Sequence, residues 1–418
     1  MFLLTWLTLP LLFLPKINIL SFGRETAGIR IDDLILLIFA VVCFWGNLTV
    51  RKSFSDIEKC VAYITGLALV SFIINRVLNV ADILNVQSSL FYALRLLEYF
   101  SFFYIGKMAV RFYSTNTIIL LFFLWNALLM VLQKIQLIGI FTSDGYQPIT
   151  SDRILGIASF GSEIGLLLNM LFCYFIYMSR AKNAENLAEM EARGARQVNA
   201  PYLLLLLFVL LVVFSGARTA IATLLITFFA CLRDIIDWRK PKTLILPTCT
   251  ILVGVALTVI ALYSFSGIVT RSKGLLSFKN IELISTVWDN IILDYDPIGR
   301  ESVSLGAHDA SWWMRIHKWC YALKLYVQHP ECWILGIGPG FAMAALDGGF
   351  LRIFTELGIV GSFFYAKFFY SIASLSRQLA WMTIVFMLNM IFFDAHLAYK
   401  PMTLLLLIAG ATMQSQAK

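Results

Sequence analysis

Apolar residues form long runs along the chain, separated by short polar or charged segments. Runs of about 15–25 residues match the helical span of a hydrocarbon core of about 30 Å, whereas transmembrane strands alternate apolar and polar residues over about ten positions. The pattern predicts an all-α polytopic membrane protein with about twelve transmembrane helices. The predicted spans cover residues 2–20, 31–48, 60–78, 88–110, 117–140, 158–178, 201–214, 219–232, 243–264, 350–371, 379–394 and 400–414.

Lysine and arginine are concentrated in alternate loops between these spans. The basic loops carry Arg51, Lys52, Lys59, Lys107, Arg111, Arg180, Lys182, Arg193, Arg196, Arg233, Arg239, Lys240, Lys242, Lys367, Arg377 and Lys418. The short loops of the opposite face carry little beyond Arg24, Arg30, Arg76, Arg153 and Lys400. Because basic residues mark the cytoplasmic side, both termini are predicted to be cytoplasmic. The first apolar run has no small-residue cleavage site, so we expect a retained helix and not a signal peptide.

Composition narrows the class of protein further. Of 418 residues, 60% are hydrophobic and only 14% are charged, whereas soluble domains carry about 25% charged residues. These proportions exclude a soluble enzyme of this length and a disordered chain. The net charge of +8 is explained by the basic cytoplasmic loops, so no nucleic acid is expected as a partner.

The longest predicted loop lies outside the membrane, between the ninth and tenth spans. We expect three parts: residues 1–263 with nine spans, residues 264–349 as the large outer loop, and residues 350–418 with the last three spans. A long connection is more often functional than idle. A second long loop, residues 179–200, is predicted to be a solvated cytoplasmic helix. The outer loop is expected to fold against the helices, because it contains Trp288, Trp312, Trp313, Trp319 and Trp333.

Cysteine and histidine give little indication of special chemistry. Of seven cysteines, Cys320 and Cys332 share the outer loop, where a disulfide is chemically possible but is left open. No spacing of histidine, cysteine and carboxylate residues resembles a metal site, so no metal is predicted.

Two charged residues lie deep within the fourth predicted span, where each costs about 2.5–3.5 kcal/mol on insertion scales. Arg95 and Glu98 are three residues apart and share one helical face. They either form an internal ion pair or line a water-filled cavity. Arg153 precedes the sixth span, and Glu163 lies about one turn inside it. Arg153 is expected to anchor the span at the membrane boundary or to join a cationic cluster.

The segment Ser215-Gly216-Ala217-Arg218-Thr219 interrupts an apolar stretch of 31 residues, from position 202 to 232. Two helices of about 20 Å must come from this stretch, and both are shorter than the hydrocarbon core. We therefore expect the turn below the outer membrane surface, with Arg218 in a cavity beside a helix N-terminus that favours an anion. The alternative is an arginine that snorkels to the surface from an ordinary hairpin.

The densest pattern of polar and glycine residues lies late in the outer loop and early in the tenth span. A nucleotide-binding loop is excluded, since no βαβ unit surrounds the glycines and no Gly-Lys-Ser/Thr follows them. The glycines are expected to let the backbone approach a bulky ligand or another helix. In order, the pattern consists of Arg315, Trp319, His329-Pro330, Gly336-Ile337-Gly338-Pro339-Gly340, Asp347-Gly348, Leu351, Glu356, Gly358 and Gly361.

In this order, these residues resemble the O-antigen polymerase and ligase superfamily of bacterial inner-membrane enzymes. The resemblance covers about residues 150–365, and the first four spans match only in hydropathy. It is carried by the Ser-Gly-Ala-Arg-Thr turn, the arginine followed four residues later by tryptophan, and the Gly-x-Gly-x-Gly stretch that leads to Leu351, Glu356, Gly358 and Gly361.

The resemblance implies a metal-independent glycosyltransferase of the GT-C-like class, without a cofactor. Such an enzyme lies in the bacterial inner membrane and joins undecaprenyl-diphosphate-linked oligosaccharide repeat units at the periplasmic face. Undecaprenyl diphosphate is the leaving group, and the product is an O-antigen, a capsule or an exopolysaccharide. The implied partners are the lipid-linked oligosaccharides, the lipid bilayer and a chain-length regulator.

The resemblance also implies roles for individual residues. Arg218 and Arg315 would hold the departing pyrophosphate, because a guanidinium binds phosphate oxygens bidentately and keeps its proton. Asp347 would be the catalytic base or would orient the acceptor sugar, and Glu356 is the rival candidate for the base. Together with the charged pair in the fourth span, which lies outside the stretch covered by the resemblance, the residues expected to bind substrate are Arg153, Glu163, Arg95, Glu98, Gly338, Gly340 and Glu356.

One position departs from the ligase branch of this superfamily. Ligases typically have His followed by Asn where this chain has Asp347 and Gly348, and the difference favours a polymerase. An O-antigen ligase that transfers glycan to lipid A–core stays open as the alternative. A flippase for lipid-linked oligosaccharides is less favoured, because a transporter would show inverted repeats with broken helices in matching halves.

Overall fold

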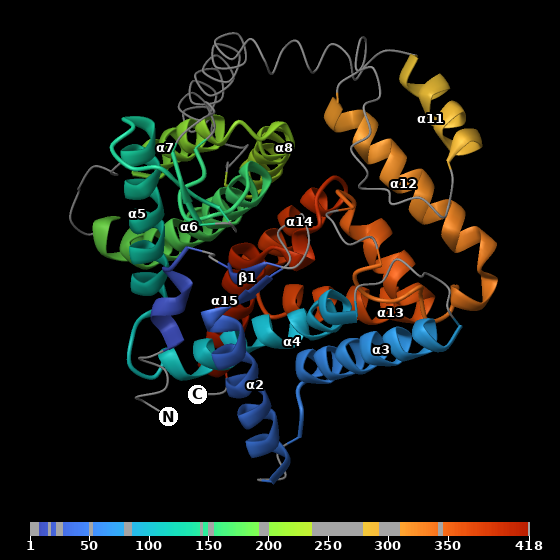
Figure 1. Ribbon diagram of the computed structural model, residues 1–418. Helices are drawn as coiled ribbons and strands as arrows, with labels where there is room; N and C mark the ends of the chain where they lie inside the picture. The colour runs from blue at the N-terminus through green and yellow to red at the C-terminus, as the bar shows by residue number, and fades with distance from the viewer. Residues whose placement is uncertain are drawn as a thin grey trace.

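The computed structural model describes residues 8–15, 18–21, 28–49, 53–78, 86–142, 145–148, 154–191, 200–235, 279–291, 310–341 and 346–416. Over these residues the protein is mostly α-helical, with two short antiparallel hairpins (Figure 1). The helices are α2 (Ile31–Thr49), α3 (Asp56–Leu78), α4 (Val86–Ala109), α5 (Thr115–Lys134), α6 (Gly161–Glu191), α7 (Ala200–Ser215), α8 (Arg218–Ile235), α11 (Lys279–Asn290), α12 (Ala310–Gln328), α13 (Gly349–Ala373), α14 (Arg377–Met390) and α15 (Tyr399–Gln416).

The remaining described elements are short. One hairpin pairs β1 (Asn18–Ser21) with β2 (Gly28–Arg30), and the other pairs β3 (Ile140–Thr142) with β4 (Gly145–Gln147). The 3-10 helices are η1 (Leu9–Leu12), η2 (Pro330–Cys332) and η3 (Ala395–Leu397).

Four of the described helical segments are long and apolar enough to cross a membrane, which is consistent with a helical membrane protein. They are Asp56–Ile74, Thr115–Lys134, Gly161–Met178 and Gly349–Ala373, and the apolar part of α8, Thr219–Phe228, is shorter. The expected total of about twelve spans stays a prediction, and its ninth member, residues 243–264, lies outside the described residues.

Two predicted segments can be compared directly with the structure. The first expected span, residues 2–20, is not one continuous helix, because its described part holds η1 and then β1. Pro10 and Pro15 explain the difference, since proline lacks the N–H group that a helix interior needs. In contrast, α6 continues to Glu191, which confirms a helix in the first part of the predicted cytoplasmic loop.

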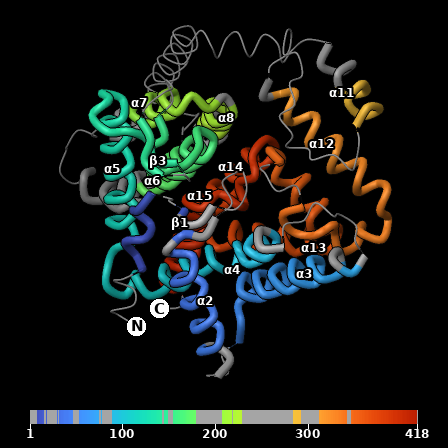
Figure 2. The backbone as a smooth tube through the Cα atoms, in the orientation of Figure 1, coloured from blue at the N-terminus to red at the C-terminus, as the bar shows by residue number. Residues whose placement is uncertain are grey.

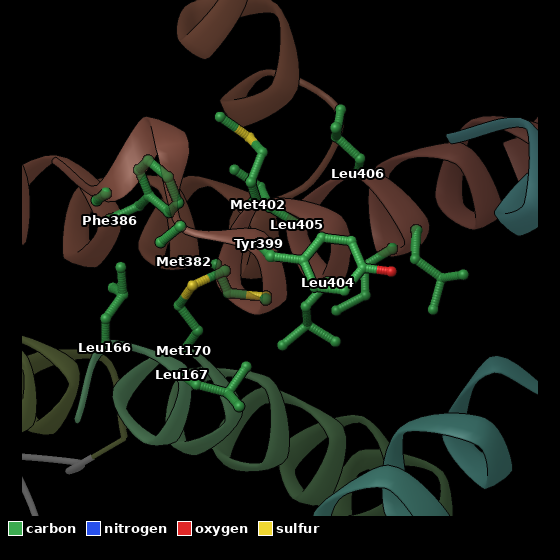
Figure 3. Packing of buried hydrophobic residues seen from close by; sticks show 14 of the residues in the cluster. Leu166, Leu167, Met170, Met382, Phe386, Tyr399, Met402, Leu404, Leu405 and Leu406 are labelled. Carbon is green, nitrogen blue, oxygen red and sulfur yellow. The ribbon is translucent and has the colours of Figure 1, made fainter. Parts of the chain in front are cut away.

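Helix α15 forms the centre of the main core. Every residue from Tyr399 to Ala411 is buried, as expected for a helix that is apolar on all sides. It packs closely along α4 because small residues line the crossing: a Cβ atom at Gly410 would collide with the backbone oxygen of Phe103, and one at Gly106 with that of Leu407. The remainder of the core joins α15 to α6 and α14, and Figure 3 shows Leu166, Leu167, Met170, Met382, Phe386 and Met402 at this junction.

Helix α13 is interrupted in its middle. At Gly358 the backbone adopts φ 65° and ψ −164°, a conformation that is essentially restricted to glycine. The backbone groups released by the break pair with the segment 333–338 that precedes α13. The hydrogen bonds run from Ile337 N to Thr355 O (2.8 Å), Gly338 N to Glu356 O (3.0 Å), Ile359 N to Trp333 O (3.0 Å) and Val360 N to Ile334 O (3.2 Å). The glycine-rich motif therefore serves backbone pairing within a candidate membrane span, where irregular backbone is tolerated only if protein covers it.

Replacing Gly358 with alanine should destabilise the protein strongly. The substitution would force a side chain into a conformation that costs about 1–3 kcal/mol, and its Cβ atom would collide with the carbonyl of Ile334. We expect a clearly lower thermal unfolding midpoint for the purified protein in detergent. Gly66→Ala on α3 is the control, because its Cβ atom meets nothing within 4 Å and alanine favours a helix. Equal midpoints for the two variants would contradict this account of the break.

The described part of the outer loop has a hydrophobic core of its own, which confirms that it is folded. The α11–α12 pair lies on the opposite side of the molecule from α5 to α8 (Figure 2), and Leu351 and Phe354 of α13 pack against this second core. Cys320 and Cys332 are both buried in it as free thiols. The core consists of Val287, Ile291, Ile316, Cys320, Tyr321, Ala322, Leu325, Tyr326, Cys332, Ile337, Phe341 and Leu346.

Candidate functional site

The candidate site lies where α12 passes the start of α13. Arg315 of α12 faces Asp347, which directly precedes α13, with 3.4 Å between Arg315 Nε and Asp347 Oδ2. The two side chains are 23% and 30% exposed, so both are accessible from outside. Trp312 lies three residues before Arg315 and Trp319 four residues after it, so both lie on the same helical face as Arg315. The two indole rings pack edge to face, with 6.0 Å between their centroids.

Asp347 is held in an unusual backbone conformation. Its φ of 56° lies in the left-handed region, which aspartate tolerates better than most residues. Asp394 accepts hydrogen bonds from the backbone N–H groups on both sides of it, Leu346 N to Oδ2 at 2.7 Å and Gly348 N to Oδ1 at 3.0 Å. The indole of Trp319 donates to the carbonyl of Leu346 at 2.9 Å. The backbone around Asp347 is therefore held by three hydrogen bonds from two side chains, Asp394 and Trp319.

The buried guanidinium of Arg352 supports this arrangement from the interior of the protein. Arg352 on the first turn of α13 is 1% exposed, and it donates to Asp394 Oδ2 and to Glu356 Oε1, each at 2.8 Å. Its guanidinium also lies 4.8 Å from the centroid of the Tyr92 ring. Glu356 Oε1 in turn accepts the N–H of Gly340 at 2.9 Å. Arg352 thus pairs with two carboxylates, Glu356 and Asp394. Glu356 accepts the N–H of Gly340, and Asp394 accepts the N–H groups of Leu346 and Gly348.

The surroundings of Asp347 favour its protonation. Burial raises the pKa of its carboxyl above the ordinary value, Asp394 adds to the rise, and Arg315 opposes it. A raised pKa makes a carboxylate a stronger base, so it is better suited to accepting a proton from a hydroxyl group. The adjacent guanidinium is suited to stabilising an anion.

Three other predicted site residues belong to the same region but have structural contacts. Gly338 and Gly340 donate their N–H groups to the backbone and the side chain of Glu356. Glu356 is 5% exposed, and it borders a cavity of about 20 Å³ together with Tyr365 and His396, which is room for a single water molecule. Glu356 therefore faces the interior, and Asp347 faces outward.

Arg95 and Glu98 form an internal ion pair with 3.0 Å between Arg95 Nη1 and Glu98 Oε2. Arg95 also contacts Asp33 at 3.3 Å, and Arg30 forms ion pairs with both Asp33 and Glu98. These four side chains, which we call the interior ion cluster, are 1–7% exposed. Arg30 lies at the end of β2, between predicted spans, and its guanidinium is buried 4.0 Å from the centroid of the Tyr399 ring.

Glu163 caps two helix starts at once. Its Oε2 accepts Ser159 N at 3.0 Å, just before α6, and its Oε1 accepts Lys400 N at 3.2 Å, at the start of α15. A carboxyl group at a helix N-terminus accepts N–H groups that have no partner within the helix. Lys400, which the sequence places at the boundary between a short loop and the last span, lies on the first turn of α15. It is 0% exposed, and its Nζ donates to the carbonyls of Leu11 and Leu12 at 3.1 and 2.8 Å.

The Ser-Gly-Ala-Arg-Thr turn does join two helices, as predicted. Gly216 has φ 64° between the end of α7 and the start of α8 at Arg218. The side chain of Arg218 and the whole of Arg153 lie outside the described residues. The convergence of Arg218 with Arg315 therefore stays a prediction.

Sequence reasoning missed the residues that organise the site, Arg352 and Asp394. A signal for Arg352 existed, since it lies four residues before Glu356 inside a predicted span, and paired charges at membrane depth rarely lack a role. Arg352, the ion-pair partner of Asp394, is 42 residues away from it in sequence. Only the folded chain brings these two residues together.

Within the described ranges, no group of three or more His, Cys, Asp or Glu side chains is arranged to hold a metal ion. No protein-family model matches the sequence, and no curated protein is significantly similar to it.

Proposed function

We propose that the protein is a polysaccharide polymerase of the bacterial inner membrane that joins undecaprenyl-diphosphate-linked oligosaccharide repeat units at the periplasmic face. The contact between Arg315 and Asp347 is the observation that carries this proposal. It brings together a proton acceptor and an anion-binding group at the end of a candidate membrane-spanning helix. A lipid-linked diphosphate sugar needs both groups at that depth.

In the proposed reaction, a hydroxyl of the acceptor sugar gives its proton to the Asp347 carboxylate. The hydroxyl oxygen forms a bond to the anomeric carbon of the donor, and the bond from that carbon to the diphosphate oxygen breaks. The electron pair leaves with undecaprenyl diphosphate, and Arg315 and Arg218 stabilise the charge. Once Asp347 is protonated it attracts Arg315 less, so the guanidinium can turn toward the leaving diphosphate.

The proposal extends to topology and partners. It places both termini in the cytoplasm, about twelve helices in the bilayer and the α11–α12 region in the periplasm. The product is an O-antigen, a capsule or an exopolysaccharide, and a chain-length regulator is the proposed protein partner.

The glycan profile of a deletion strain tests the proposed reaction. Complementation with Arg218→Ala should leave single capped repeat units and no ladder, at an unchanged protein level, because a cation that binds the leaving diphosphate is lost. Arg233→Ala, near the other end of α8, is the matched control and should restore the ladder. A normal ladder from Arg218→Ala would contradict the role of this arginine. Long lipid-linked glycan in the deletion strain would favour the ligase alternative instead.

A further inference from the structure

We propose that Asp394 and Arg352 are positioning residues that hold the Asp347 carboxylate toward Arg315. The proposal rests on the proposed function, in which Asp347 receives the proton of the acceptor hydroxyl. Neither residue contacts the outer surface, since Asp394 is 4% and Arg352 is 1% exposed. They act on Asp347 through the backbone.

The geometry at Asp394 carries the first step of the argument. A carboxylate has two oxygens, and here each accepts one of the two N–H groups that flank Asp347. Gly348 N belongs to the peptide after Asp347, and the carbonyl of Leu346, which accepts the Trp319 indole N–H, belongs to the peptide before it. Asp394 and Trp319 together therefore hold both peptides that flank Asp347, which has the left-handed conformation with φ 56°. In that conformation the Asp347 side chain reaches Arg315 on α12.

Arg352 carries the second step. An aspartate buried to this degree is stable as a carboxylate only when it is paired, and Arg352 Nη1 supplies that pairing at 2.8 Å. The same guanidinium holds Glu356 through Nε, so Asp394 cannot turn away without breaking the arrangement of α13. A lysine would keep the charge but could not bridge both carboxylates with a planar fork.

A direct test follows the titration of Asp347 and needs no glycosyl transfer. The full-length protein in lipid nanodiscs is treated with a water-soluble carbodiimide and an amine across a pH series, and amidation of Asp347 is quantified by mass spectrometry. Because the reagent attacks the protonated acid, the midpoint of labelling reports the pKa of Asp347. Charged groups facing it are Arg315 and Lys318 from α12 and Asp394 from the segment after α14.

We expect Arg352→Lys to move the midpoint down by about half a pH unit or more, toward the ordinary aspartate value of about 3.9. The variant keeps the charge, so the shift requires that Asp347 has moved into water. Asp394→Asn should shift it in the same direction, because the amide nitrogen that replaces one carboxylate oxygen is a donor and cannot accept its N–H group, and because a nearby negative charge is lost. Asp33→Asn in the interior ion cluster is the matched control and should leave the midpoint unchanged.

Trp319→Phe provides a test that does not depend on whether Arg352→Lys and Asp394→Asn fold. It removes the indole donor to the carbonyl of Leu346 but keeps an aromatic ring, whereas Trp313→Phe on the same helix is the control, because Trp313 stacks on His317 instead. A lower midpoint for Trp319→Phe alone would support positioning through the 346–348 backbone. An unchanged midpoint in every folded variant would overturn the proposal.

The outcomes for positioning and for function are distinguishable. Suppose that the labelling midpoint shifts in the Arg352, Asp394 or Trp319 variants while Asp347→Asn still extends glycan fully. This result would support the positioning network and overturn the role of Asp347 in the reaction. Suppose instead that the labelling midpoint is unchanged in those variants while Asp347→Asn loses extension. This result would overturn the positioning network and leave the proposed function standing.

Discussion

Replacing Asp347 with asparagine is expected to slow glycan extension by about 10²–10⁴-fold, the usual contribution of a positioned general base. The amide cannot take the proton of the acceptor hydroxyl, yet it fits the same left-handed backbone conformation. Binding of the lipid-linked substrate should change little, so the loss should be found in kcat. The measurement is the rate of chain extension by purified protein with synthetic lipid-linked repeat units.

The pH dependence provides a second check on the same residue. A base works only when it is deprotonated, and the pKa of Asp347 is raised by burial. Activity should therefore fall on acidification at a higher pH than an ordinary aspartate would give, and this acid limb should disappear in Asp347→Asn. Asp289→Asn on α11 is the control, because this carboxylate is exposed in the same outer region. Wild-type turnover in Asp347→Asn would remove this residue from the reaction.

Replacing Arg315 with alanine is expected to have an effect of similar size, about 10²–10³-fold on turnover, as for the loss of one group that stabilises a leaving anion. Arg315→Lys should recover little activity, since an ammonium cannot bind two phosphate oxygens as a planar fork. Turnover of both variants is measured at a fixed protein level, with the exposed Arg111→Ala as control.

Arg315 should also affect the acid limb of the pH profile. Its charge lowers the pKa of Asp347, so its removal should raise that pKa further and move the acid limb to higher pH. A role confined to the leaving group would lower turnover without moving the limb. Undiminished turnover in Arg315→Ala would contradict the proposed reaction itself.

Local patterns predicted the parts of the molecule that depend on neighbours in sequence. The spacing of Arg95 and Glu98 indicated a shared helical face, and they do form an ion pair. The glycines between positions 336 and 340 indicated a close backbone approach, which occurs at the break in α13. In each case the physical constraint acts within a few residues, so the sequence alone contains it.

The missed features depend on contacts between distant segments. The position of Arg30 between predicted spans does not indicate its burial, because its partner Glu98 is 68 residues away in sequence. Lys400 is buried because carbonyls near the N-terminus receive its ammonium. Asp394 is paired with a residue on another helix. Periodicity and spacing carry no information about such partners, because the fold decides which charges meet.

The break in α13 has a consequence for how the chain enters the bilayer. Four backbone groups around Gly358 pair with the segment 333–338, and carbonyls without a partner in hydrocarbon are strongly unfavourable. This helix therefore cannot settle as an independent unit when it leaves the translocation machinery. The segment 333–338 must be docked against α13 before these backbone groups are satisfied, so we expect the two segments to assemble together.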